Sequence, residues 1–227
     1  MKLLAVETAT PACSAALLVD GEILEKYELA PREHTKLILP MIGSLMAEAG
    51  LSVQQLDGLA FGRGPGSFTG VRIATGVIHG IALGADLPVA PISTLASIAQ
   101  DYFNRQGADC VLAAMDARMG EIFFGAYQKN ENGLARLLQQ EQVTPASEIV
   151  FPPLKAAGAG SGWSVYRDEL TLRVGEWLTH IDDQILPRAA TVVQLAENDF
   201  NNGLAVPVEQ AMPVYLRDKV AKKESER

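Results

Sequence analysis

One arrangement of strands occurs twice along this chain, and it limits the fold more than any other feature does. The two runs of strands cover residues 2–8, 13–19 and 22–29, and then residues 110–116, 121–128 and 134–142. The first strand of each run ends in an acid followed by a turn, Glu7 in the first run and Asp116 in the second. A repeated three-stranded meander predicts a duplicated domain, with one subdomain over residues 1–107 and a second over residues 108–227.

Helices and further strands follow each meander. We expect strands at residues 59–61 and 88–92, and helices at residues 35–49, 69–84, 93–104, 163–170, 191–198 and 212–222. Strands that alternate with helices predict parallel strands beside the meander, so the fold class is α/β. The second subdomain contains fewer alternating strands and helices, so it is predicted to be reduced. Packing of its last helix back on the first subdomain stays open, and residues 223–227 are predicted to be a frayed tail.

Composition excludes several classes of protein. The chain has 227 residues, of which 48% are hydrophobic, enough for a substantial core, and no apolar run approaches the roughly 18 residues of a membrane span. Its formal net charge of −8 opposes independent binding of nucleic acid, which normally needs a basic patch. Cys13 and Cys110 lack the spacing of a disulfide or zinc motif, which predicts buried free thiols in a reducing cytoplasm.

The most unusual segment is the glycine-rich loop of residues 62–72, which reads GRGPGSFTGVR and joins an apolar strand to a long apolar helix. Glycines permit positive φ angles and the close approach of another group, and Ser67 or Thr69 can cap the helix that follows. The loop has no lysine for a Walker motif, and Ser67 occupies the place of the third glycine of a dinucleotide fingerprint. Two interpretations stay open, a tight strand-to-helix turn and a loop that holds an anion.

Two helices carry more apolar surface than one sheet face can cover. The apolar positions of residues 35–49 occupy an arc of about 200°, twice the width of an ordinary one-sided stripe. The helix over residues 69–84 carries Gly76, Gly80 and Gly84 at four-residue spacing, and each interior glycine costs about 1 kcal/mol relative to alanine. Close packing against another helix would explain them. The pattern fits burial inside a larger domain as well as an interface with another chain.

Six segments resemble the bacterial TsaB (YeaZ) family. They are residues 4–10 (LAVETAT) with Ser14, His34 with residues 39–42 (LPMI), residues 64–72 (GPGSFTGVR), residues 92–95 (ISTL), residues 116–118 (DAR) and residues 213–217 (PVYLR). The match spans nearly the whole chain in the right order. The resemblance implies the duplicated fold of actin, sugar kinases and the Hsp70 ATPase (ASKHA).

The resemblance also implies a function. Proteins of this family support threonylcarbamoylation of adenosine 37 (t6A37) in tRNAs that read codons starting with A. The transfer itself is carried out by the paralogue TsaD. The implied role is a non-catalytic subunit that forms a heterodimer with TsaD, joins the ATPase TsaE in a ternary complex, and forms a homodimer when TsaD is absent. Contact with tRNA would be indirect, no cofactor would be held tightly, and ATP or ADP would bind only in the complex.

Catalytic interpretations find little support in the residues. TsaD-type members hold a metal through a His-x-x-x-His pair, but the residues four positions after the three histidines are Ile38, Leu83 and Gln184. We therefore expect no metal site, and we interpret His34 as a capping or interface residue. The alternative function is an ATP-dependent small-molecule kinase. Against it, the turn after Asp116 contains Arg118 and Met119, which are bulky for a phosphate turn.

Two groups of residues follow as candidate sites, and no catalytic residue is among them. The predicted partner interface consists of Leu37, Met41, Leu45, Arg72, Ile73, Gly76, His79 and Gly80. The predicted vestigial or interfacial loop for a nucleotide or anion consists of Glu7, Thr8, Gly66, Ser67 and Asp116.

Overall fold

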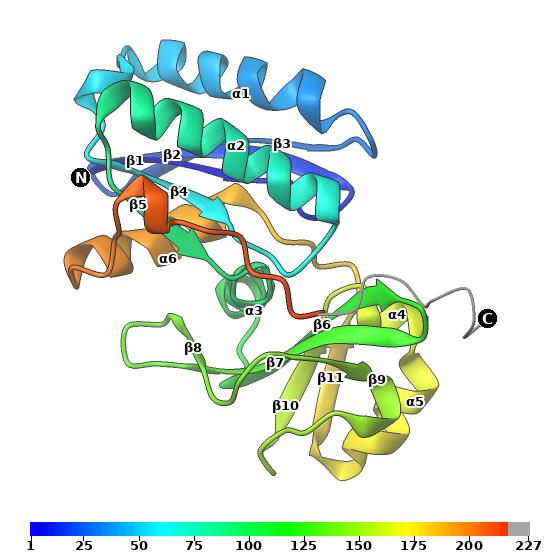
Figure 1. Ribbon diagram of the computed structural model, residues 1–227. Helices are drawn as coiled ribbons and strands as arrows, with labels where there is room; N and C mark the ends of the chain where they lie inside the picture. The colour runs from blue at the N-terminus through cyan, green and yellow to red at the C-terminus, as the bar shows by residue number, and fades with distance from the viewer. Residues whose placement is uncertain (218–227) are drawn as a thin grey trace.

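The computed structural model describes residues 1–217 and forms two lobes, each built on one sheet (Figure 1). The first sheet has the order β3-β2-β1-β4-β5. Its strands are β1 (Lys2–Glu7), β2 (Ala12–Val19), β3 (Glu22–Leu29), β4 (Gly58–Gly62) and β5 (Val89–Ile92). The first three strands are antiparallel neighbours, and β4 and β5 are parallel to β1. The predicted first meander is confirmed, and its third strand has the predicted bounds.

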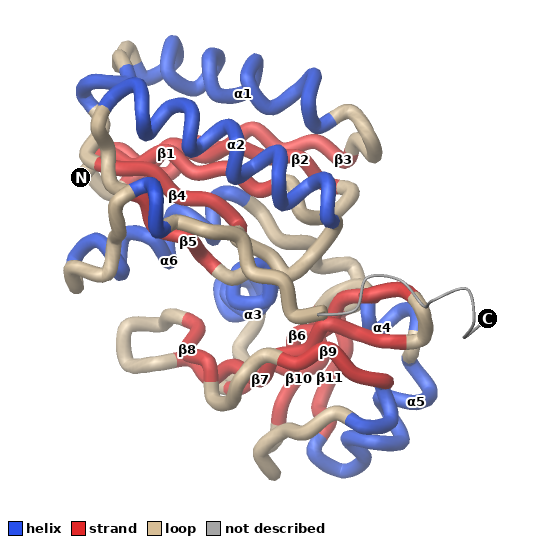
Figure 2. Tube along the Cα trace, viewed as in Figure 1, coloured by secondary structure: helices blue, strands red, loops and turns tan. Residues whose placement is uncertain are grey.

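Helices cover both faces of this sheet (Figure 2). Helices α1 (His34–Ala49) and α2 (Phe68–Ala85) lie side by side on one face, and α6 (Ala189–Asn201) covers the other. The alternation of β1 sorts its side chains accordingly, because Leu4 and Val6 join the core under α1 and α2, whereas Leu3 and Ala5 join the core under α6. A helix from the end of the chain thus completes the lobe that the first third of the chain begins.

The second sheet repeats the strand arrangement of the first. Its order is β11-β10-β6-β7-β8, with β9 also paired to β7. The strands are β6 (Cys110–Arg118), β7 (Glu121–Lys129), β8 (Ala135–Leu137), β9 (Gln142–Pro145), β10 (Ala156–Ala159) and β11 (Leu178–Asp182). As in the first sheet, an antiparallel hairpin is followed by strands parallel to its first member. This lobe also holds α4 (Gly162–Val165) and α5 (Arg167–Val174).

Three predicted elements of the second half differ in the structure. The single strand expected at 134–142 is two short strands, because the chain leaves the sheet between them and Glu141 accepts hydrogen bonds from Ser93 and Tyr127. The helix expected at 163–170 is interrupted at Tyr166, whose backbone is not helical. Of the helix expected at 212–222, residues 212–217 have no helical structure, and the remainder lies outside the described residues, as does the predicted tail at 223–227.

The segment of residues 206–217, here called the C-terminal strap, crosses from the first lobe to the second (Figure 1). At its start Val206 exchanges two backbone hydrogen bonds of 2.9 Å with Val89 on β5. Farther along, the Val214 N–H donates to the Arg63 carbonyl over 2.8 Å. At its end Arg217 forms an ion pair with Glu121, at the start of β7. The strap is therefore bonded to both lobes.

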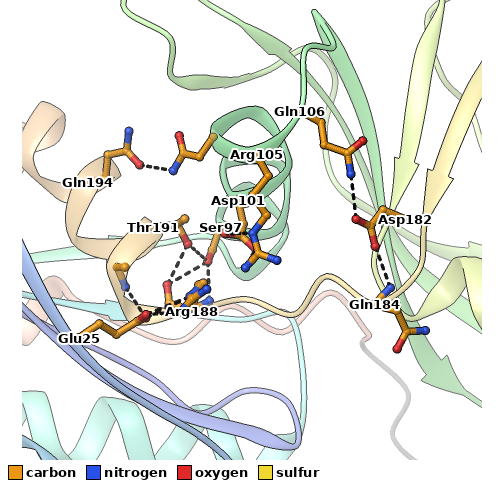
Figure 3. A network of polar contacts seen from close by, with 12 residues as sticks. Glu25, Ser97, Asp101, Arg105, Gln106, Asp182, Gln184, Arg188, Thr191 and Gln194 are labelled. Atoms are coloured by element: carbon orange, nitrogen blue, oxygen red, sulfur yellow. Dashed lines mark hydrogen bonds and ion pairs between the residues drawn. The ribbon is translucent and has the colours of Figure 1, made fainter.

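Helix α3 (Thr94–Arg105) lies at the junction of the lobes (Figure 3). Its Ser97 hydroxyl lies 2.6 Å from that of Thr191 on α6, and the Gln106 amide just after it donates to Asp182 on β11 over 3.0 Å. Arg188, which precedes α6, pairs with Glu25 on β3. Polar contacts therefore hold α3 to both lobes, in addition to the apolar packing of its other side on β6.

Helix α2 corrects one expectation from composition. It is 18 residues long and apolar enough, by length and composition alone, to cross a membrane. Its buried positions Ala74, Ile78 and Ala82 pack in the core of the first lobe. The helix is thus part of the core of a globular lobe, and its opposite side is left exposed.

Candidate functional sites: the glycine loop and the α1–α2 face

The glycine loop packs its backbone directly on the turn that follows β1. A Cβ atom on Gly66 would lie 2.7 Å from both the Cβ and the carbonyl oxygen of Ala9, and one on Gly70 would overlap the carbonyl oxygen of Thr8. Two hydrogen bonds join the segments, from the Ser67 N–H to Ala9 O over 2.8 Å and from the Thr8 hydroxyl to Gly70 O over 2.7 Å. These glycines are needed for the close approach of two backbones.

Ser67 is one of the two residues predicted to cap this helix, and it is the N-cap of α2. Its hydroxyl accepts a hydrogen bond from the Gly70 N–H over 3.3 Å. The N–H groups of Ser67 and Gly70 are thus already bonded within the chain. Of the two interpretations of the loop, the tight strand-to-helix turn accounts for its contacts.

Glu7 is fully buried beneath this contact. Its carboxylate accepts a hydrogen bond from the Ala9 N–H over 2.6 Å, and a Cβ on Gly62 would overlap its Oε2 atom. Burial raises the pKa of Glu7 from 4.5 to about 7, against hydrogen bonds from Ala9, Thr8 and Thr94 that lower it. The Glu7 carboxyl is therefore enclosed by the chain's own groups, and the anion loop stays a prediction.

Asp116 does not join the other four residues predicted for this site. Its carboxylate accepts a hydrogen bond from the Arg118 N–H over 2.8 Å and pairs with the Arg118 guanidinium over 2.9 Å. The turn is completed by Arg118 and Met119 with φ of 64° and 59°. Glu7, Thr8, Gly66 and Ser67 therefore converge, whereas Asp116 is bonded to its own turn in the second lobe.

The predicted interface residues fall into three groups on α1 and α2. Gly76 and Gly80 are exposed, and no atom of residues 1–217 lies within 4 Å of a Cβ built on either, nor of one on Gly84. Arg72 is exposed as well, while Leu37, Met41 and Ile73 are half-buried against the core. Leu45 is a correction: its side chain has no exposed surface, because it packs in the core beneath α1.

Both helix histidines hold backbone carbonyls. The His79 Nε2 atom donates to the Ala211 carbonyl over 2.7 Å, which attaches the strap to α2. His34 is buried at the start of α1, with its Nε2 atom 2.8 Å from the Thr10 carbonyl; the N-cap of this helix is Glu33. Among residues 1–217, no three histidine, cysteine, aspartate or glutamate side chains gather as a metal site.

Sequence reasoning missed an exposed aromatic cluster at the start of α2. The Arg72 guanidinium lies 3.2 Å from the ring centre of Phe68, and the Tyr215 ring on the strap lies 5.9 Å from that of Phe68. The i, i+4 spacing of Phe68 and Arg72 was the available signal. The exposure of Leu39 (57%) and of Leu83 (67%) was not predicted either.

Comparison with known proteins places the chain in a family. A family model described as "TsaD: tRNA N6-adenosine threonylcarbamoyltransferase" matches residues 25–225. The chain is 44% identical over 231 residues to the tRNA threonylcarbamoyladenosine biosynthesis protein TsaB of Escherichia coli, with 97% of this chain and 96% of that protein covered. The TsaB protein of Haemophilus influenzae is 40% identical, with 97% and 95% covered.

A solved structure agrees with these relatives. YeaZ from Pseudomonas aeruginosa superposes with a TM-score of 0.89 at 43% sequence identity, covering 95% of this chain and 99% of that one. The resemblance carried by the six sequence segments is thereby confirmed. This chain belongs to the TsaB (YeaZ) family of proteins of tRNA threonylcarbamoyladenosine biosynthesis, a family related to TsaD.

Proposed function

We propose that this chain is a non-catalytic subunit needed for t6A37 formation, which works in the cytoplasm with TsaE. It binds TsaD through the exposed side of α1 and α2, here called the α1–α2 face, which carries Leu39, Arg72, Gly76, Gly80, Leu83 and Gly84. TsaD carries out the transfer in this proposal, and tRNA contacts the assembly mainly through the other subunits. The observation that carries the proposal is the exposed glycine stripe of α2. Its three glycines have open space around them, so the backbone of a second helix can approach closely.

The family relation suggests why the partner would be TsaD. The family model for TsaD matches 25–225, so TsaD and this chain share ancestry over most of this length. A related protein offers a related pair of helices, and two such pairs can meet about a pseudo-twofold axis. A second copy of this chain would occupy the same face when TsaD is absent.

Exposed leucines support the same surface. Leu39 on α1 and Leu83 on α2 are apolar, and their exposure has a cost that burial by a partner would remove. Arg72, also exposed and on α2, would form part of a polar rim.

A substitution at the glycine stripe tests this proposal. Gly80→Trp places a large side chain where a second helix would approach, and it leaves the core of the lobe untouched because the site is open. We expect the heterodimer with TsaD to be lost in size-exclusion chromatography with light scattering, while the thermal unfolding of the single chain is unchanged. Gly107→Trp is the matched control, because Gly107 is equally open but lies between α3 and β6. A heterodimer of unchanged size with Gly80→Trp would refute the interface.

The role in tRNA modification is tested separately. Incorporation of labelled threonine into unmodified tRNA by TsaD, TsaE and the adenylate-forming enzyme should require this chain, and this chain without TsaD should give none. We further propose that ATP or ADP binds only within the complex, since the glycine loop and the Asp116 turn are both bonded within the chain. The kinase alternative requires ATP binding to the isolated chain that is lost in Asp116→Asn.

The two sheets support a proposal about origin. In both, the first strand of an antiparallel hairpin has a parallel strand on its other side, and a second parallel strand follows that one. We attribute this common order to duplication within an ASKHA-type fold, with the boundary near residue 107.

A further inference from the structure

A cavity of about 340 Å³ lies between the lobes, away from the α1–α2 face. The ends of β5 and α6, the start of α3 and the β7–β8 hairpin border it, and Figure 1 shows β8 below α6 and beside α3. Its volume is at the lower end of the range for small-molecule sites. The charged groups that line it are Arg63, Arg136, Glu141 and Asp199.

The backbone of Arg63 is hydrogen-bonded through both its N–H and its carbonyl group, whereas its side chain has a donor without a partner within residues 1–217. Its N–H donates to the Ile92 carbonyl over 2.8 Å, and its carbonyl accepts the hydrogen bond from Val214 of the strap over 2.8 Å. The Nε atom of its side chain is buried and has no hydrogen-bond partner in the part of the chain that the structure describes. Arg63 lines the cavity, and no ion pair of its guanidinium is found within residues 1–217, so a ligand carboxylate in the cavity would meet a cation without an acidic partner.

Glu141 is held by two hydroxyls on one side only. Its Oε1 atom accepts hydrogen bonds from both Ser93 and Tyr127, and no partner for Oε2 is found within residues 1–217. The buried Tyr127 hydroxyl and the N-cap Ser93 thus fix the orientation of a carboxylate that retains a free acceptor. This carboxylate can accept hydrogen bonds from a ligand.

Asp199 lines the same cavity from α6. Burial raises the pKa of Asp199, and the positive charge of Arg63 acts against that rise, so the two charges are close enough to interact. No ion pair within 4.0 Å joins them among the described residues. The cavity therefore presents a cation and an anion that are close but unpaired.

The charges of the lining specify the ligand. Two arginines and two acids sum to zero, so the cavity favours a molecule with no net charge that carries both signs. The remaining lining is largely apolar and includes Ile92, Leu134 and Leu195, which suits a small aliphatic side chain. Phosphates and nucleotides fit less well, because two carboxylates repel them.

We propose that this cavity binds a small zwitterionic α-amino acid, with the ligand carboxylate on Arg63 and the ligand ammonium between Glu141 and Asp199. The site is independent of the proposed TsaD interface. The hydroxyls of Ser93 and Tyr127 hold the Glu141 carboxylate in place before the ligand arrives, which lowers the ordering cost of binding at that end.

Isothermal titration calorimetry of the full chain with each of the twenty amino acids tests the proposal. At least one with a small, uncharged side chain should bind saturably, and its analogues lacking either the carboxylate or the ammonium should bind at least tenfold more weakly, about the contribution of one charge-assisted hydrogen bond. Absence of saturable heat for every amino acid with a small, uncharged side chain at about 10 mM, where a ligand of about 1 mM Kd would be mostly bound, would overturn it. Binding of AMP in place of every amino acid would overturn it as well.

Variants locate the binding in this cavity. Arg63→Gln and Asp199→Asn should each weaken the bound amino acid at least tenfold. Arg167→Gln is the control, because Arg167 pairs with Asp183 in the second lobe and does not line the cavity. Should Arg63→Gln fail to fold in a thermal melt, Asp199→Asn and Glu141→Gln decide the matter. Undiminished affinity in those two would refute the proposed site.

Discussion

Two glycines on one helix should respond in opposite ways to the same substitution. Gly70→Ala and Gly76→Ala both add a single methyl group to α2, and both gain about 1 kcal/mol in helix propensity. A Cβ on Gly76 meets nothing within 4 Å, whereas one on Gly70 would overlap the Thr8 carbonyl oxygen and lie 3.0 Å from its carbon. The comparison therefore isolates the effect of the close backbone approach.

The magnitude for Gly70→Ala follows from three terms. Relief of the overlap requires backbone movement, which costs about 1–3 kcal/mol. Separation of the segments weakens the 2.7 Å hydrogen bond from the Thr8 hydroxyl to Gly70 O, worth about 1 kcal/mol. After the propensity gain, the net loss is about 2 kcal/mol, or about 4–8 °C in Tm for a chain of this size. For Gly76→Ala we expect a gain of up to about 1 kcal/mol.

Urea unfolding followed by circular dichroism, together with thermal melts, would measure both variants. The expected result is a lower unfolding midpoint for Gly70→Ala and an unchanged or higher one for Gly76→Ala. Equal midpoints for wild type and Gly70→Ala would refute the reasoning, because they would show that the loop can move off the turn at no cost.

Three further predictions concern stability. Burial raises the pKa of Glu7 to about 7, so the folded chain binds the proton more tightly than the unfolded one. The contribution of this group to stability is present below about pH 4.5 and is lost as pH rises through 7, by about 3 kcal/mol. The unfolding free energy of Glu7→Gln, measured by urea titrations from pH 5 to pH 8, should therefore change less with pH than that of the wild type. An identical slope in both proteins would contradict this. Leu45→Ala should cost about 2–5 kcal/mol in the same assay, because its side chain is fully buried, whereas the exposed Leu39→Ala should change little. Arg217→Ala removes the ion pair with Glu121 and should speed amide hydrogen exchange in the strap, measured by mass spectrometry; unchanged exchange would show that the pair does not hold the strap.

Local patterns predicted the first lobe well. The strand at Glu22–Leu29 was placed correctly because it follows the tight turn at Asp20 and Gly21. In the second lobe, the expected strand at 134–142 fails because its course depends on Ser93 and Tyr127, which are distant in sequence. Hydrophobic patterns do not record such contacts.

The glycines show a second limit of sequence reasoning. Gly70 and Gly76 look alike in the helix pattern, yet one packs against a backbone of the same chain and the other faces open space. In the same way, the wide apolar arc of α1 indicated excess surface but did not separate Leu45, which is buried, from Leu39, which is exposed. Leu45 faces the core that α1, α2 and the sheet form, whereas Leu39 lies outside it.

The C-terminal strap has a mechanical consequence. Proteins that close two lobes around a ligand need a hinge whose backbone angles can change. Here the strap is bonded to the first lobe through Val214 and Arg63 and to the second through Arg217 and Glu121, so a hinge motion would have to break one of these attachments as well as the contacts of α3 with the two lobes. The architecture is that of a braced frame. A frame of this kind holds its outer surface at constant shape, which suits the docking proposed for the α1–α2 face.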